Sequence, residues 1–269
     1  MRKLIVAVAL SALFGGCTSG KVSSLLFSPA DDRQLGEQVS EEIASNPQEY
    51  PVLDKSQYPK AYGYLNSMKD RILRSNDVDY LEEFAWELKI INDDDMLNAF
   101  ATPGGYIYVY TGLIKFLENA DDLAGVMGHE IAHADRRHSI KQLEKQYGIT
   151  ILASILLGEN SSQLAQIAAQ LAGTGAILKF SRTAESEADE YSVYYLADTP
   201  YACNGAASFF QKLLDQGKAG GTPEFLSTHP SPSNRVSDIN NQAEAQGCST
   251  QLTNETGMTY AEFKASLPK

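Results

Sequence analysis

The sequence predicts one α+β domain that is mainly helical, with a small antiparallel sheet placed just before a histidine-bearing helix. Apolar residues recur at helical spacing near the start of the chain and over most of the region after Gly112. Between residues 84 and 110 they alternate with a period of two, which is typical of strands. The 269 residues and the 43% hydrophobic content suit one large globular domain with a core.

Helical periodicity first appears from Asp31, where apolar residues follow four apart. A second helix is predicted after the proline-containing loop at residues 46–59. Two later segments, residues 149–158 and 164–180, are apolar enough to raise the question of a membrane span. The first is too short to cross a bilayer, which takes about 20 residues, and the second is interrupted by glutamines and glycines. We interpret both as buried helices.

The predicted strands lie in two stretches. Residues 84–91 (FAWELKII) alternate apolar and polar side chains and predict one strand. Residues 96–112 predict two further strands around the turn TPGG. In the last strand, three tyrosines share one face and Ile107 and Val109 share the other.

The first 16 residues are typical of a secretion signal. Arg2 and Lys3 precede about a dozen apolar residues, too few to span a bilayer, and small residues follow up to Cys17. The ending LFGGC resembles a bacterial lipobox, which predicts cleavage before Cys17 and acylation of that cysteine. Phe14 stands where leucine is commonest in such boxes, and a plain secretion signal is the alternative.

Residues 17–30 are serine-rich and aperiodic and predict a tether, so the expected folded domain covers residues 31–269. Thr18 and Ser19 follow the lipidation site. An aspartate after the lipidated cysteine would resemble a signal for retention in the inner membrane, and this chain has none there. This favours a periplasmic protein anchored to the outer membrane. A membrane partner is therefore expected through the lipid on Cys17.

The net charge excludes one class of partner. The chain has 34 acidic and 22 basic residues, for a formal charge of −12. Such a protein is repelled by nucleic acid, and no basic run reverses the effect. We expect no nucleic-acid partner.

Two cysteines remain beyond Cys17, at positions 203 and 248. In an exported chain such a pair indicates one disulfide, Cys203–Cys248. Closing a loop of about 45 residues would stabilise the fold by ~3–4 kcal/mol in the chain-entropy model. Two free buried thiols are the alternative.

The stretch GVMGHEIAHADRRH, at residues 125–138, predicts a metal site. On a helix, His129 and His133 lie one turn apart on the same face, so both imidazoles can reach one ion. Glu130 is rotated by about 100° from His129 and can take a proton from a water beside the metal. This is the chemistry of the H-E-x-x-H motif, and the expected metal is zinc.

A catalytic zinc takes three protein ligands and leaves one position open. One zincin class places a glycine three residues after the second histidine and a third histidine six residues after the second. Here those positions are Arg136 and Ser139, which excludes that class. His138 has the wrong spacing and is expected to be structural or exposed. A cysteine upstream of the helix could also be the third ligand, but the only one there is Cys17, the predicted lipidation site. A glutamate downstream of the helix therefore remains as the candidate for the third ligand.

The segment SRTAESEADEYSVYYLA, at residues 181–197, offers that glutamate. On a helix, Glu185 and Asp189 lie one turn apart, so Glu185 can bind the ion and Asp189 can accept a hydrogen bond from a ligand imidazole. Spacing alone does not separate Glu185 from Glu187, but the role available to Asp189 favours Glu185. Glu187 is expected to be solvated or hydrogen-bonded to backbone. An ordinary acidic helix face is the alternative.

The last histidine, His229, lies in LSTHPSPSNRVSDI. A peptidase needs a donor that stabilises the oxyanion, and His229 could serve with support from Arg235. It could instead fill the open zinc position in a resting state. The alternative without function is a turn residue that caps a helix starting near Ser231.

Four stretches together resemble the HtpX-like and CAAX-prenyl-endopeptidase-type zinc metallopeptidases, in particular their small periplasmic lipoprotein members. They are residues 98–114, 121–139, 180–192 and 227–236. The resemblance implies a gluzincin fold with one zinc per chain. It also implies zinc ligands at His129, His133 and Glu185, with Glu130 as the general base.

The same resemblance assigns further residues. The family motif E-x-x-A-D falls on residues 185–189, and His229 falls on the histidine that supports the transition state. The resemblance also implies that the edge strand NAFAT pairs with extended substrate through Asn98, Ala99 and Phe100.

The expected function is that of a zinc endopeptidase of the bacterial envelope, which cleaves misfolded or outer-membrane proteins in quality control. The alternative is a zinc-containing lipoprotein that assists the outer-membrane assembly machinery as a chaperone-like binding module. Glu130 favours the enzyme, because a purely structural metal site has no use for a free carboxylate there. A protease that also holds unfolded chains is a third possibility.

Overall fold

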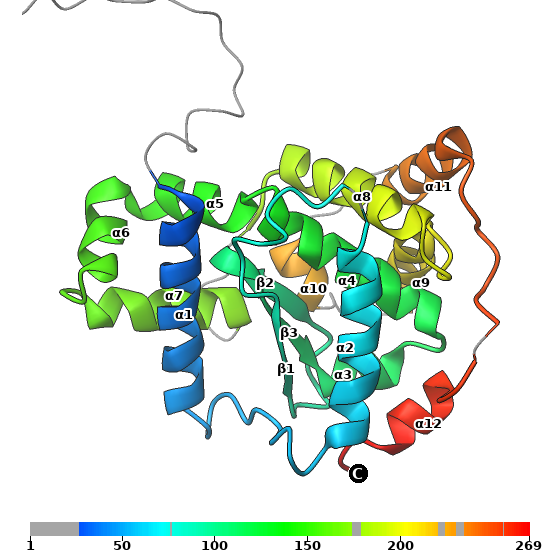
Figure 1. Cartoon of the computed structure of the whole chain (residues 1–269), viewed down its shortest axis with the longest axis horizontal. Coiled ribbons are helices and arrows are strands. Elements are labelled where there is room, and N and C mark those ends of the chain that lie inside the picture. The colour runs from blue at the N-terminus through cyan, green and yellow to red at the C-terminus, as the bar shows by residue number, and fades with distance from the viewer. Residues whose placement is uncertain (1–26, 76, 174–178, 220–223, 230–233, 255) are drawn as a thin grey trace, which may run out of the picture.

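In this computed structural model the part of the chain that is described comprises residues 27–75, 77–173, 179–219, 224–229, 234–254 and 256–269 (Figure 1). The predicted leader, the lipidation site Cys17 and residues 18–26 of the predicted tether lie outside it. Among the described residues, no helix is long and apolar enough to cross a membrane.

Helices make up most of the described chain, as the sequence predicts. A small sheet consists of β1 (Glu87–Ile91), β2 (Ala99–Thr102) and β3 (Tyr106–Tyr110), with a short 3-10 turn at Pro103–Gly105 between the last two. The helices are α1 (Pro29–Ser45), α2 (Pro59–Leu73), α3 (Thr111–Phe116), α4 (Ala120–Asp135), α5 (His138–Tyr147), α6 (Ile149–Leu156), α7 (Ser161–Ala172), α8 (Arg182–Ala197), α9 (Gly205–Ala219), α10 (Glu224–Thr228), α11 (Arg235–Gln246) and α12 (Tyr260–Ala265).

The sheet is mixed rather than antiparallel throughout. Its strand order is β1-β3-β2, with β2 antiparallel to β3 and β1 parallel to β3, so that Glu87 faces Tyr106 and Ile91 faces Tyr110. The β2–β3 hairpin is the one that the sequence predicts. After β1, however, residues 92–98 carry the chain past β3 to its far side, which leaves β1 and β3 running in the same direction. As a result β2 is an edge strand.

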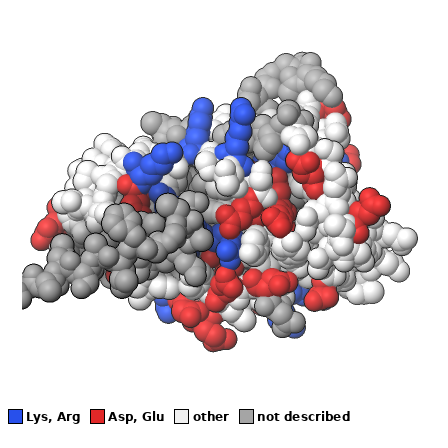
Figure 2. Space-filling view, turned by 90° about the horizontal axis from the view of Figure 1, so that it is seen from above, with Lys and Arg blue, Asp and Glu red and all other residues white. Residues whose placement is uncertain are grey.

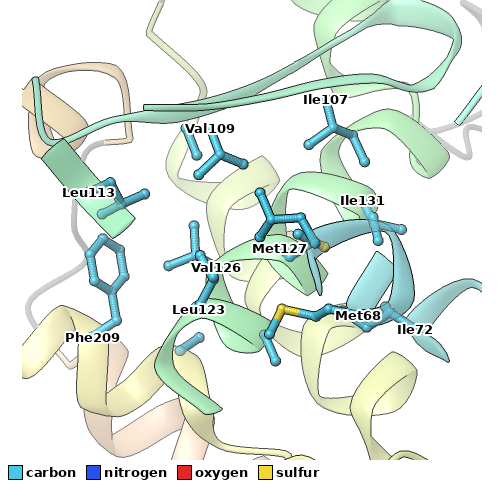
Figure 3. Close-up of a cluster of buried hydrophobic side chains, with 14 of the residues drawn as sticks. Met68, Ile72, Ile107, Val109, Leu113, Leu123, Val126, Met127, Ile131 and Phe209 are labelled. Atoms are coloured by element: carbon cyan, nitrogen blue, oxygen red, sulfur yellow. The ribbon is translucent and has the colours of Figure 1, made fainter. Parts of the chain in front are cut away.

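The two faces of β3 enter different parts of the core, as the alternation predicts. Tyr106, Tyr108 and Tyr110 pack with residues of α1 and α7, whereas Ile107 and Val109 pack with residues of α2 and α4. Figure 1 shows α1, α6 and α7 on one side of the sheet and α2, α4 and α9 on the other. Figure 3 shows Ile107 and Val109 above the labelled apolar side chains of α4 and α2.

The folded part of the chain begins earlier than residue 31. Phe27 is buried, and Ser28 caps α1 in a capping box with Asp31. Asp32 then forms a buried ion pair with Arg137, in which Nε and Nη2 of the guanidinium donate to the carboxylate at 2.7 and 2.9 Å. This pair fastens the start of α1 to the chain just after α4.

The apolar segment after Gly148 is buried only in part. Leu152 and Ile155 on α6 are buried, but Ile149 is 44% exposed and Leu157, just after the helix, is 73% exposed. The prediction of a buried helix is therefore right for one face of α6 and wrong for the other. The helix packs with one face only.

A disulfide joins Cys203 and Cys248, which are 45 residues apart in the chain. Cys203 lies just before α9, and Cys248 lies just after α11. The bridge fastens these two helices together at one end, next to residue Ala243, whose carbonyl also contacts Cys248.

Helix α4 is packed so closely against α9 that glycine is required at the crossing. A Cβ on Gly125 would lie 2.1 Å from the backbone nitrogen of Ala206. A Cβ on Gly205 would lie 2.1 Å from the carbonyl oxygen of Asp121. On another side of α4, the Ser192 hydroxyl of α8 donates to the Gly125 carbonyl at 3.1 Å. These contacts fix α4 between α8 and α9.

We expect Gly125→Ala to destabilise the fold by about 1–3 kcal/mol, because the added methyl group forces two backbones apart. Urea unfolding of the metal-free protein measures the effect. Gly63→Ala is the matched control, since nothing lies within 4 Å of a Cβ at that exposed position of α2. The free energy of unfolding of this control should rise by about 0.5–1 kcal/mol. Equal effects of the two substitutions would contradict the close crossing.

Candidate metal centre

The centre is built on α4, a helix with all 16 residues buried. Its apolar side chains pack against the sheet and neighbouring helices, and its polar side chains have no access to water. A buried polar group is costly unless it is paired. The polar residues of α4 therefore need partners within the protein, and His129, Glu130 and His133 meet at one place.

Four buried side chains converge there. One ligand atom from each of His129, His133, Glu185 and His229 lies within 4.8 Å of the others. The Nε2 atoms of His129 and His133 are 3.0 Å apart, and each lies 3.5 Å from a carboxylate oxygen of Glu185. Glu185 comes from the first turn of α8, and His229 directly follows α10. The structure thus brings together the three predicted metal ligands and His229.

These residues fit a divalent metal ion such as zinc. Imidazole nitrogens and a carboxylate are the usual donors of a catalytic zinc, and a pair of Nε2 atoms aimed at one point suits a shared cation. Burial opposes the charged form of Glu185, but His229 and hydrogen bonds from His129 and His133 hold its pKa well below the usual range. Burial lowers the pKa of His133 far below its usual value. An ionised carboxylate and a neutral imidazole are the forms that bind metal.

Glu130 lies beside this cluster and is 1% exposed. Its Oε1 atom has no hydrogen-bond partner among the described residues, and His229 Nε2 lies 3.6 Å away. Burial raises the pKa of Glu130 to about 8, and the charge of Glu185 adds to this rise. His129 and a backbone hydrogen bond from Ala101 on β2 oppose it. A raised pKa makes the ionised form of this carboxylate a stronger base.

Asp189 has the contact that the sequence predicts. Its Oδ1 lies 2.9 Å from His129 Nδ1, the ring nitrogen that faces away from the cluster. Arg235 holds the same carboxylate through Nε at 2.6 Å and Nη2 at 2.7 Å. Arg235 was expected to support His229. Instead it binds Asp189, lies 3.0 Å from Glu185, and covers the ring of Phe210.

His138 and Glu187 are the residues that sequence reasoning missed. His138 is buried, with Nδ1 3.1 Å from His133 Nδ1 and Nε2 3.2 Å from Glu187 Oε2. The other oxygen of Glu187 accepts from Arg136 Nε at 3.0 Å, and the hydrogen bond to His138 holds the pKa of Glu187 at about 2. The prediction that Glu187 is solvated or bonded to backbone is right only in part, because its side chain is 34% exposed but its hydrogen bonds join it to side chains. The spacing from His133 to His138 does not fit one helix, because α4 ends before Arg137, a residue with φ of 58°.

The segment predicted to bind substrate is buried along the edge strand β2. Asn98 is fully buried, and neither its amide nitrogen nor its amide oxygen has a hydrogen-bond partner among the described residues. Ala99 and Phe100 are also buried. The Phe100 ring stacks on Tyr108 with centroids 4.6 Å apart, so this side chain is committed to the core. The backbone carbonyl of Asn98 accepts from the Tyr110 backbone N–H at 3.1 Å.

The fold and the site define a metallopeptidase of the gluzincin-like kind, in which a buried H-E-x-x-H helix and a downstream glutamate converge. The profile of peptidase family M48 matches residues 59–243, and the chain belongs to this family.

Several curated proteins are similar to this chain. The beta-barrel assembly-enhancing protease of Escherichia coli (strain K12) is 34% identical over 191 residues, which cover 67% of this chain and 38% of that protein. The mitochondrial metalloendopeptidase OMA1 of Schizosaccharomyces pombe is 29% identical over 206 residues, which cover 75% of this chain and 59% of that protein. The matched stretch thus spans 38% of the first relative and 59% of the second, less than two thirds of either.

We expect Arg235→Leu to destabilise the metal-free protein by about 3–5 kcal/mol. The substitution leaves the buried carboxylates of Asp189 and Glu185 without their cation, which costs more than the loss of the contacts alone. Urea unfolding measures the change, with Asp238→Asn, an exposed position on the same helix, as control. If the two variants unfold at the same urea concentration, Arg235 does not compensate these charges.

Proposed function

We propose that the chain is a zinc-dependent endopeptidase of the bacterial cell envelope that hydrolyses misfolded or outer-membrane proteins. The position of Glu130 carries this proposal. Its carboxylate is buried next to the donor atoms of His129, His133 and Glu185, and one oxygen has no hydrogen-bond partner. A site that only stabilised the fold would not leave a buried carboxylate in this state.

Glu130 acts as the general base and then as the general acid. It accepts the proton of the attacking water and passes it to the amine of the leaving peptide. When bound, zinc supplies Lewis acidity towards the water and the scissile carbonyl. His129, His133 and Glu185 would hold the ion, and the Asp189 carboxylate, 2.9 Å from His129 Nδ1, would keep that ring in place.

His229 is proposed to donate a hydrogen bond to the oxyanion. Its Nε2 lies 3.6 Å from Glu130 Oε1, next to the proposed general base. Its ring stacks on Phe225 with centroids 4.2 Å apart, which fixes the direction of the imidazole. Its Nδ1 lies 3.4 Å from His129 Nε2, so the same side chain can also fill the fourth metal position in a resting state.

The substrate is proposed to be an extended polypeptide that adds to β2. This strand pairs with β3 on one side, and its Ala101 backbone reaches Glu130. Main-chain pairing along such an edge accepts many sequences, which suits unfolded chains. Asn98 precedes the strand and offers a buried amide donor and acceptor. Asn98, Ala99 and Phe100 would contribute through the Asn98 amide and the strand backbone.

The proposed location is the periplasm, with the protein anchored to the outer membrane by a lipid on Cys17. The proposal rests on the leader predicted at residues 1–16 and on the tether predicted after it, with the folded part beginning at Phe27. The narrower resemblance to the small lipoprotein members of the HtpX-like peptidases points the same way. The name of the Escherichia coli relative, a beta-barrel assembly-enhancing protease, supports the outer-membrane assembly machinery as a partner.

We expect Glu130→Gln to lower kcat/KM for unfolded casein by about 10²- to 10⁴-fold while one zinc per chain stays bound. The amide cannot accept the proton, but it does not disturb the three metal ligands. The full chain in detergent is assayed for zinc content and cleavage, with Glu190→Gln on the exposed face of α8 as control.

A metal-loaded Glu130→Gln protein that still cleaves casein would disprove the mechanism. Zinc bound by both proteins without cleavage by either would favour the chaperone-like binding module.

Removal of the metal should abolish cleavage and lower the melting temperature. Ligand binding to the folded state adds about 4 kcal/mol when free zinc is 1,000 times its dissociation constant. Calorimetry before and after dialysis against a chelator, followed by return of zinc, measures both effects. Glu185→Ala is the control, because zinc should raise its melting temperature far less. Full activity after complete removal of metal would contradict the proposal.

A further inference from the structure

We propose that His138 and Glu187 are positioning residues that fix the tautomer and orientation of the metal ligand His133. The inference rests on the proposed function, because it assigns a role within the same zinc site. It concerns one buried and one partly buried contact that neither the H-E-x-x-H motif nor the E-x-x-A-D motif includes.

A continuous series of contacts leads from the cluster to the surface of the protein. His133 Nδ1 lies 3.1 Å from His138 Nδ1, and His138 Nε2 lies 3.2 Å from Glu187 Oε2. Arg136 donates through Nε to the second oxygen of Glu187 at 3.0 Å and through Nη1 to Asp79. The side chain of His133 is fully buried, that of His138 is 3% exposed, and that of Glu187 is 34% exposed.

The direction of each hydrogen bond follows from the chemistry of the groups. An ionised Glu187 only accepts, so His138 donates to it through Nε2. In a neutral imidazole the other nitrogen is then an acceptor, which makes His138 Nδ1 an acceptor for His133 Nδ1–H. His133 therefore carries its proton on Nδ1 and presents the lone pair of Nε2 to the cluster, 3.5 Å from Glu185. That is the form a metal ligand needs.

The two histidine ligands are supported in parallel ways. His129 Nδ1 contacts the carboxylate of Asp189, which is held by Arg235. His133 Nδ1 contacts His138, which contacts the carboxylate of Glu187, and that carboxylate is held by Arg136. Each ligand is thus coupled to a carboxylate that an arginine fixes. Such outer partners orient a ligand and raise its basicity.

The geometry of α8 explains why Glu187 contacts His133 through His138 rather than directly. Glu185 and Asp189 are one turn apart and face the cluster together. Glu187 is rotated by about 200° from Glu185 and faces away from it. A side chain in that direction reaches the end of α4 rather than the His133 ring. His138 spans the gap because the left-handed residue Arg137, held by Asp32, starts α5 beside His133.

The experiment compares zinc binding by four variants of the full chain in detergent. His138→Leu removes the acceptor, whereas His138→Asn keeps an oxygen near the position of Nδ1. Glu187→Gln removes the charge that orients His138, and Glu190→Gln is the control on the same helix. Competition with a chromophoric chelator gives the zinc affinity, and an excess of a second chelator gives the dissociation rate.

We expect His138→Leu to weaken zinc binding by about 10- to 100-fold and to speed its release. His138→Asn should restore most of the affinity, Glu187→Gln should lie between the two, and Glu190→Gln should match the wild type. The melting temperatures of the zinc-free proteins separate a structural role from a positioning role. If the residue were purely structural, its substitution would lower the melting temperature and leave the zinc affinity unchanged.

Wild-type zinc affinity in His138→Leu, or equal losses in the leucine and asparagine variants, would overturn the inference. If His138→Leu does not fold, Glu187→Gln decides, since that side chain is part-exposed and its unchanged affinity would also overturn it. A wild type that binds zinc without cleaving casein would refute the peptidase function alone, and the order of affinities would still test the inference. A wild type that binds no zinc would refute both.

Discussion

The burial of α4 along its whole length is the constraint on which the rest of the structure depends. The polar groups that this helix carries need partners inside the protein, and neighbouring elements supply them to several, although Glu130 Oε1 has no hydrogen-bond partner among the described residues. At the end of the helix, Asp135 accepts hydrogen bonds from the backbone of Asp79 and Tyr80 and from the Tyr195 hydroxyl. In its middle, His129 and His133 face Glu185, and the sheet and two helices close around them. The site exists because the helix is enclosed.

Charge balance then explains the surroundings of the site. Glu130, Glu185 and Asp189 bring three carboxylates into the interior, and Arg235 is the guanidinium that contacts two of them. A divalent cation among His129, His133 and Glu185 would supply the positive charge that this interior needs. Acidic and basic side chains are more separated on the surface. Figure 2 shows acidic side chains spread over the centre and lower part of one face, with basic side chains mainly along its upper edge.

Contacts within one helix could be predicted from the sequence, and contacts across a break could not. His129 and His133 share a face by helical geometry, and so do Glu185 and Asp189. The contact from His133 to His138 depends on a left-handed residue that ends one helix and starts the next, and no periodicity encodes it. The parallel pairing of β1 with β3 escaped prediction for a similar reason. Alternation identifies a strand and its faces, but it carries no information about the neighbour or its direction.

The crossing of α4 and α9 limits how this sequence can change over time. A side chain that is too large can often be accommodated when its neighbour becomes smaller. Gly125 and Gly205 have no such recourse, because each faces main-chain atoms of the other helix. Main-chain atoms cannot be trimmed by mutation, so a substitution at either position has no compensating partner. These two positions are barriers to neutral drift, and Gly125 lies one helical turn before His129.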